Sequence, residues 1–148
     1  MRICDRRLLF VLDALLWIAE HAGGEGRALP QRRLARLQGV PGRFLEHDLQ
    51  RLVRAGILKG SRGPRGGYRL ARPAETILLG EVIAALSTRG KAAVEPGEVR
   101  SPFLRHAILP LFTELEDRIA ALLSERTLAD LIATARARAE PERLEDVA

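Results

Sequence analysis

Residues 61–73 read SRGPRGGYRLARP, and this stretch decides how the whole chain is interpreted. Three glycines and a proline within residues 63–67 favour a tight turn. Residues 68–72 then alternate in the manner of a β-strand. The stretch therefore predicts a β-hairpin with a glycine-rich tip. Its side-chain donors are Ser61, Arg62, Arg65, Tyr68, Arg69 and Arg72. Such a loop can bring backbone N–H groups and guanidinium groups close to phosphate.

Two short helical segments precede this hairpin. The first is predicted at residues 29–37, with Pro30 at a tolerated first-turn position. Gly39 can adopt the left-handed conformation that ends a helix, and Pro41 can start the next helix, which extends to Arg54. Two short helices around a glycine turn match the helix–turn–helix pattern, although an ordinary helical hairpin would look the same. A cationic hairpin directly after them makes the combination a winged helix–turn–helix.

The second of these helices has one apolar and one polar face. The apolar face consists of Phe44 or Leu45 together with Leu49, Leu52 and Val53. The polar face carries Arg43, Glu46, His47, Gln50 and Arg51. A helix with such a face can place its N-terminal half in the major groove of DNA.

Apolar periodicity predicts four further helices. The first ends near His21, the second covers residues 76–86, and the last begins after Thr127, which can cap it. Between them, residues 102–124 predict a long helix. Its apolar residues recur at steps of four and three and favour a helix-to-helix seam between two subunits, or packing on the same domain. They are Leu104, Ile108, Leu111, Leu115, Ile119 and Leu122.

These elements predict a mainly α fold with a small β-hairpin wing. Residues 1–86 are expected to form a winged helix–turn–helix DNA-binding domain, and residues 87–101 a loop. Residues 102–140 are expected to hold the dimerisation helix and a C-terminal helix. Residues 141–148 form a charged tail that we expect to fray.

The charge distribution favours a polyanionic partner. The chain has a formal net charge of +5. Residues 1–73 contain 15 Arg or Lys against 6 Asp or Glu, whereas residues 74–148 contain 9 against 13. A basic first half joined to an acidic second half suggests that the first half meets nucleic acid. A solvated surface of uneven composition is the alternative.

Cysteine content and hydropathy bear on the compartment. The single cysteine, Cys4, excludes an intrachain disulfide, which fits a reducing environment. Cys4 is either a redox-sensitive thiol or an incidental small residue. The apolar run at residues 8–19 is too short for a bilayer span of about 20 residues. Asp13 inside that run argues against a signal peptide, so we expect a cytoplasmic protein.

Five stretches, in order along nearly the whole chain, resemble the family of small winged-helix regulators that includes IscR, NsrR and CymR. They are FVLDALLWIA at residues 10–19, Phe44-Leu45-Glu46 with its exit at Ala55-Gly56, RGPRGGYRLARP at residues 62–73, ILLGEVIAAL at residues 77–86, and TLADLI at residues 127–132. The resemblance implies a homodimeric transcription regulator, commonly a repressor, that binds a pseudo-palindromic operator in double-stranded DNA. It also implies that the long helix crosses its counterpart in a partner subunit.

Carried over position by position, the resemblance assigns roles to single residues. The places that face base edges are taken by Arg43, Glu46 and His47. Arg62 takes the wing position that enters the minor groove, where Arg is electrostatically favoured. The places near phosphate are taken by Gly63, Arg65 and Tyr68. With neighbouring positions, the expected DNA-binding residues are Arg43, Phe44, Glu46, His47, Arg51, Arg62, Gly63, Arg65, Gly66 and Tyr68.

Many members of that family hold an iron–sulfur cluster through three cysteines in the loop before the long helix, but this loop contains none. Counting back from Thr127 puts His106 at the third cysteine's place. The other two places fall near Val94 and Arg100, which cannot ligate iron as thiolates do. We therefore expect no such cluster and no other cofactor. His106 is a candidate for metal binding or pH sensing, with a surface or packing role as the alternative.

Two other functions compete with DNA binding. An interaction module that keeps the fold and senses a ligand or partner would not need Arg62 at the wing tip. An enzyme would need a nucleophile–base pair, paired carboxylates or a phosphate-cradling loop before a helix, and we find none in the sequence. The operator, a small-molecule or protein effector, and the choice between repression and activation are left open.

Overall fold

The fold is mainly helical with one two-stranded hairpin, in agreement with the predicted winged helix–turn–helix. The computed structural model describes residues 6–21, 27–86 and 101–138. The expected loop therefore lies almost entirely, and the expected tail wholly, outside the described residues. The helices are α1 (Arg6–His21), α2 (Gln31–Gln38), α3 (Glu46–Arg54), α4 (Leu79–Leu86), α5 (Leu109–Ser124) and α6 (Leu128–Arg138). The strands are β1 (Leu58–Ser61) and β2 (Gly67–Leu70).

Helix α1 runs through the centre of the core. Its buried residues follow helical spacing, which places one apolar stripe against the other elements. They are Val11, Ala14, Leu15 and Ile18. The same cluster contains Leu49 and Leu52 of α3, Ile77, and Val82 of α4. Burying each of these side chains stabilises the fold by about 1.5–3 kcal/mol.

The two helices of the helix–turn–helix are shorter than predicted. Helix α2 begins at Gln31 because Pro30 is extended (φ −63°, ψ 137°) and Leu29 is paired with Tyr68. It ends at Gly39, whose φ of 63° is the expected left-handed geometry. Helix α3 begins only at Glu46, since residues 42–45 form turns. Arg43 and Phe44 therefore lie before the recognition helix and not on it.

The hairpin is antiparallel, with Leu58 opposite Leu70 and Ser61 opposite Gly67. Leu58 is buried at its base, whereas the tip is exposed. The pair of strands is extended by one residue of the segment before α2, because Leu29 bridges to Tyr68. This bridge anchors the wing to the helix–turn–helix.

The helix predicted at residues 76–86 is also shorter. A 3-10 turn covers Ala74–Thr76, and α4 starts at Leu79. The residues between them pair with the turn that precedes α6. The Leu79 N–H donates to the Arg126 carbonyl at 2.8 Å, and the Leu128 N–H donates to the Ile77 carbonyl at 3.0 Å. Tertiary pairing therefore holds Ile77 in an extended conformation.

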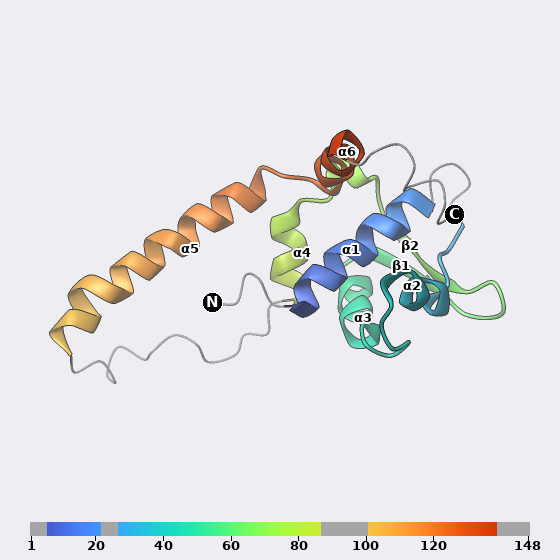
Figure 1. Cartoon of the computed structure of the whole chain (residues 1–148), viewed down its shortest axis with the longest axis horizontal. Helices are drawn as coiled ribbons and strands as arrows, with labels where there is room; N and C mark the ends of the chain where they lie inside the picture. The colour runs from blue at the N-terminus through green and yellow to red at the C-terminus, as the bar shows by residue number, and fades with distance from the viewer. Residues whose placement is uncertain (1–5, 22–26, 87–100, 139–148) are drawn as a thin grey trace.

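The long helix is present over the predicted residues 102–124, with a π-helical segment at Leu104–Ile108. Figure 1 shows that α5 extends away from the other elements, toward the end of the molecule opposite the hairpin tip. Near its C-terminal end, Leu123 packs against the core. Helix α6 then returns to α1, where Arg136 pairs with Glu20 at 2.7 Å. Within the described ranges, no helix is long and apolar enough to cross a membrane.

Candidate nucleic-acid interface

A groove of about 590 Å³ lies between α3 and the hairpin. Three parts of the chain that are distant in sequence form its walls: the start of α2, the outer side of α3, and the wing. The lining residues are Gln31, Gln50, Val53, Arg54, Gly60, Ser61, Arg62, Gly63, Gly66, Gly67 and Tyr68. The fold thus brings the predicted recognition helix and the predicted wing residues to one face.

The wing tip presents two arginines on a glycine turn. Arg62 and Arg65 are exposed, and no acid within the described ranges forms an ion pair with either. The turn is closed by the Gly66 N–H, which donates to the Gly63 carbonyl at 2.9 Å. Gly63 has a φ of +100°, and a Cβ on Gly66 would lie 2.4 Å from the Ser61 carbonyl oxygen. Both glycines are therefore required by the turn itself, which orients the arginines outward.

Helix α3 turns its inner side to the core and its outer side to solvent. His47 and Gln50 are exposed, and Arg43 is exposed in the turn just before the helix. Glu46 and Arg51 are half-buried. The residues expected at base edges thus gather at the N-terminal end of α3, where a recognition helix contacts bases.

Phe44, which we predicted among the DNA-binding residues, has a packing contact instead of an exposed position. Its ring meets the Phe10 ring of α1 edge-on, with centroids 5.6 Å apart and planes at 82°. Such aromatic pairs add about 0.5–1.5 kcal/mol beyond area burial. The contact supports the turn that carries Arg43.

Tyr68 of β2 lines the groove between the hairpin and α3. Burial, and then the neighbouring Glu46 carboxylate, raise the pKa of its phenol above the ordinary value. Both effects disfavour the phenolate. A tyrosine hydroxyl is a proton donor at neutral pH in any case, and it can donate a hydrogen bond to a phosphate.

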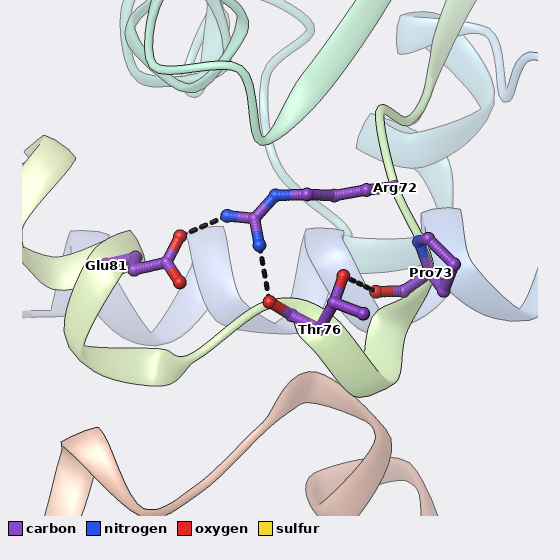
Figure 2. A network of polar contacts seen from close by, with 4 residues as sticks. All are labelled: Arg72, Pro73, Thr76 and Glu81. Carbon is purple, nitrogen blue, oxygen red and sulfur yellow. Dashed lines mark hydrogen bonds and ion pairs between the residues drawn. The ribbon is translucent and has the colours of Figure 1, made fainter.

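Arg72, which the sequence grouped with the hairpin donors, is half-buried and turns toward α4 (Figure 2). Figure 2 shows its guanidinium donating to the Thr76 carbonyl and pairing with Glu81 of α4. Thr76 in turn donates its hydroxyl to the Pro73 carbonyl at 2.7 Å. Arg72 therefore ties the exit of the wing to α4 and is not part of the candidate interface.

The groove also contains residues that sequence reasoning did not select. Gln31 and Arg54 line it, and the Gln31 amide donates to the Gly42 carbonyl at 2.6 Å. No motif marks Gln31, because its position depends on how α2 packs beside the wing. Helix α2 adds positive charge through Arg32, Arg33 and Arg36. Burial, followed by the charges of Arg33 and Arg27, lowers the pKa of the nearby His21.

The apolar seam expected on the long helix is largely exposed in the single chain. Leu111 and Leu122 are each 54% exposed, and Leu115 is 40% exposed. Ile108 is also exposed, whereas Leu104 and Ile119 are half-buried. The structure adds two aromatic residues that the pattern missed, Phe103 and Phe112. An apolar surface of this extent marks an interaction site.

A helix–turn–helix with an arginine-tipped wing defines a winged-helix DNA-binding protein. Residues 4–134 match the model of the Rrf2 family, described as iron-dependent transcriptional regulators, and the chain belongs to this family. It is therefore a DNA-binding transcriptional regulator and not an enzyme, as predicted.

Individual relatives agree with this assignment. The Synechocystis sp. protein slr0846, described as an HTH-type transcriptional regulator, is 36% identical over 105 residues, which cover 71% of each chain. The HTH-type transcriptional regulator IscR of Escherichia coli is 32% identical over 130 residues, covering 83% of this chain and 75% of that one. The solved structure of T. potens IscR has the same fold, with a TM-score of 0.72 at 24% identity over 98% of this chain and 96% of that one.

The residues of this chain do not fit the three-cysteine cluster considered above. The sequence holds one cysteine, Cys4, which lies outside the described residues. Within the described ranges, no three His, Cys, Asp or Glu side chains are grouped as metal ligands would be. His106 is exposed in the π-helical segment. A single thiolate cannot replace the ligand set of a cluster.

Proposed function

We propose that this regulator is a homodimeric repressor that reads a pseudo-palindromic operator. Helix α3 enters the major groove, and the wing places Arg62 in the adjacent minor groove. The observation that carries the proposal is the groove between α3 and the hairpin, which Gln50, Arg54 and Arg62 line. The recognition segment and the wing tip add the exposed side chains of Arg43, His47 and Arg65. Bases and phosphates are thereby recognised from a single side of the molecule.

The side chains divide between sequence reading and positioning. Arg43 can donate two hydrogen bonds to guanine, and Glu46 can accept from the cytosine amino group. Arg65, the Tyr68 hydroxyl and the turn N–H groups are suited to phosphate oxygens, which set the register of the protein on the duplex. Arg62 is suited to a narrow minor groove, where the negative potential is enhanced.

The exposed apolar surface of α5 supports the homodimer. A helix that leaves its domain with exposed leucines requires a partner surface of the same character. A second copy of α5 supplies it through a two-fold axis, so that each residue is used twice. Two-fold symmetry in the protein corresponds to pseudo-palindromy in the operator.

We propose that the signal controlling DNA binding is not an iron–sulfur cluster of the three-cysteine type, because the loop before the long helix lacks the cysteine ligands. A small molecule, a thiol change or a protein partner takes its place. The lone cysteine suggests a reducing compartment, and the proposed target is DNA. Both fit a cytoplasmic protein.

Selection of genomic DNA fragments by the purified chain, with and without oxidant, tests the proposal. The expected result is a set of enriched fragments that share a motif with two-fold symmetry. An Arg62→Ala, Arg65→Ala double variant should enrich the same fragments poorly, whereas Arg138→Ala, a change of an exposed arginine on α6, should not differ from the wild type. A motif without symmetry, or no enrichment over random fragments, would contradict it.

A further inference from the structure

Asp48 is the charged residue that the described part of the chain buries. It is 4% exposed and lies on the inner side of α3, together with Leu49 and Leu52. A carboxylate in such a place is costly unless it is paired with a cation. Its presence on the recognition helix therefore needs a partner and a reason.

The partner is Arg7, in the first turn of α1 and 41 residues away in sequence. The Arg7 Nε donates to the Asp48 Oδ2, with the Arg7 side chain 48% and the Asp48 side chain 6% exposed. Leu8, Val11 and Leu86 leave a hollow of about 80 Å³ beside this pair. Apolar packing is thus incomplete at this end of α3, and the polar contact joins the two helices.

Helix α1 holds the recognition segment at a second point one turn further along. Phe10 packs edge-on against Phe44, in the turn that leads into α3. The Arg6 guanidinium carbon lies over the Phe10 ring, 5.5 Å from its centre. One contact before the helix and one in its first turn together restrict both its position and its rotation.

We propose that Arg7 and Asp48 are a positioning pair that sets the rotation of α3 about its own axis, and so the direction in which Glu46 and His47 meet base edges. The inference rests on the reading role of α3 in the proposed function. Hydrophobic contacts such as those of Leu49 are non-directional, whereas a guanidinium–carboxylate contact has a defined geometry. Side-chain tips lie about 5–6 Å from a helix axis, so a rotation of about 10° displaces them by about 1 Å. Displacements of that size exceed what a productive site tolerates.

The decisive variant is the double substitution Arg7→Met with Asp48→Leu. It preserves net charge and replaces the pair by apolar side chains of similar length, an exchange that is often neutral or stabilising. The probes are a genomic fragment enriched by the wild-type chain and a scrambled duplex of equal length and composition. Kd for both duplexes, the salt dependence of binding and Tm are measured.

We expect Tm to be unchanged or raised, and the salt slope to be unchanged because the phosphate contacts persist. The Kd for the scrambled duplex divided by the Kd for the genomic fragment measures sequence discrimination. We expect this ratio to fall about tenfold, as when one base contact is misplaced. A merely structural pair would lower both affinities together with Tm and would leave the ratio intact. Arg7→Lys keeps a cation beside Asp48 and should retain most of the discrimination that the double variant loses. Glu20→Gln removes a different ion pair of α1, the one with Arg136, and should leave the ratio unchanged.

A Kd ratio within about twofold of wild type in a folded double variant overturns the proposal, since that is the scatter of independent sites. Glu46→Ala separates the two levels of inference. If Glu46→Ala lowers the ratio while the double variant does not, the positioning role alone is wrong. If neither lowers it, the reading role of α3 is wrong as well.

Discussion

Leu29 and Tyr68 exchange both of their backbone hydrogen bonds, with N···O distances of 2.8 and 2.9 Å. This bridge joins the segment before α2 to the second strand of the wing. The wing is thereby held against the helix–turn–helix, and the groove between them acquires a fixed width. The closeness of the two backbones also explains a glycine in the wing motif.

Gly67→Ala should destabilise the fold. A Cβ at this position would lie 2.3 Å from the Leu29 carbonyl oxygen, and its φ of +157° is unfavourable for other residues. We expect a loss of about 2 kcal/mol or more in the free energy of unfolding, measured by urea denaturation. Gly42→Ala is the matched control, because nothing lies within 4 Å of its Cβ position. Equal stability of the two variants would show that the Leu29–Tyr68 bridge is dispensable.

Arg62→Ala should weaken operator binding while leaving the fold intact, because the side chain is exposed at the wing tip. We expect a loss of about 1–3 kcal/mol if Arg62 reads a specific step of the minor groove. A gel-shift titration at fixed salt measures it, with Arg138→Ala as the control for the loss of one positive charge. Unchanged binding by the Arg62 variant would remove this residue from the interface.

Leu115→Glu should convert the proposed dimer to monomer. The side chain is 40% exposed on α5 and belongs to the apolar surface that we propose contacts a second copy of the chain. Loss of a buried leucine costs about 1.5–3 kcal/mol. In a two-fold symmetric interface the substitution is present once in each subunit, so the cost is doubled and the dimer Kd should rise about 100-fold or more. Sedimentation velocity over a concentration series gives the Kd. Asp117→Asn on the same helix should have no effect, and a wild-type chain that is monomeric at micromolar concentration would contradict the dimer itself.

Asp130 should make stability depend on pH on the acid side. Its carboxylate accepts hydrogen bonds from the Thr127 N–H at 2.8 Å and the Thr127 hydroxyl at 2.9 Å at the start of α6. The backbone hydrogen bond, more than the others, lowers the pKa of Asp130 below 3.8. The pKa of Asp130 is lower in the folded protein than in the unfolded protein. Its contribution to the free energy of unfolding is therefore complete at pH values above the unfolded pKa, and it is lost as pH falls through the folded pKa.

The comparison of wild type with Asp130→Asn by urea midpoint at several pH values checks this direction. The stability difference should be constant near neutrality and should shrink once the pH drops below 3.8. Glu125→Gln, an exposed change just before α6, serves as the control. A difference that grows toward acid pH would have the wrong sign for this cap.

Anaerobic purification followed by iron and sulfide analysis should find no stoichiometric cluster, since three thiolate ligands are missing. The visible absorption of the protein provides a second measurement on the same sample. A cluster at one per chain would overturn this expectation. His106→Ala would then show whether the exposed histidine of the π-helical segment takes part.

Local sequence determined the elements that depend on backbone chemistry and on periodicity. The glycines and arginines of residues 61–73 specify a cationic turn, Gly39 specifies the end of α2, and the apolar spacing of residues 102–124 specifies one long helix. These features follow from conformational preferences of residues close in sequence, so no knowledge of the packed fold was necessary. The class of protein followed from their order.

Only the tertiary structure decided where several elements start and which charges are used internally. Leu29 and Ile77 leave predicted helices because each pairs with a backbone segment that is distant in sequence. Asp48 leaves the solvated surface, and the half-buried Arg72 turns toward α4, because Arg7 and Glu81 come within ion-pair distance only after folding. The physical reason is the same in each case: a contact between distant segments outweighs a local preference that is worth about 1 kcal/mol or less per residue.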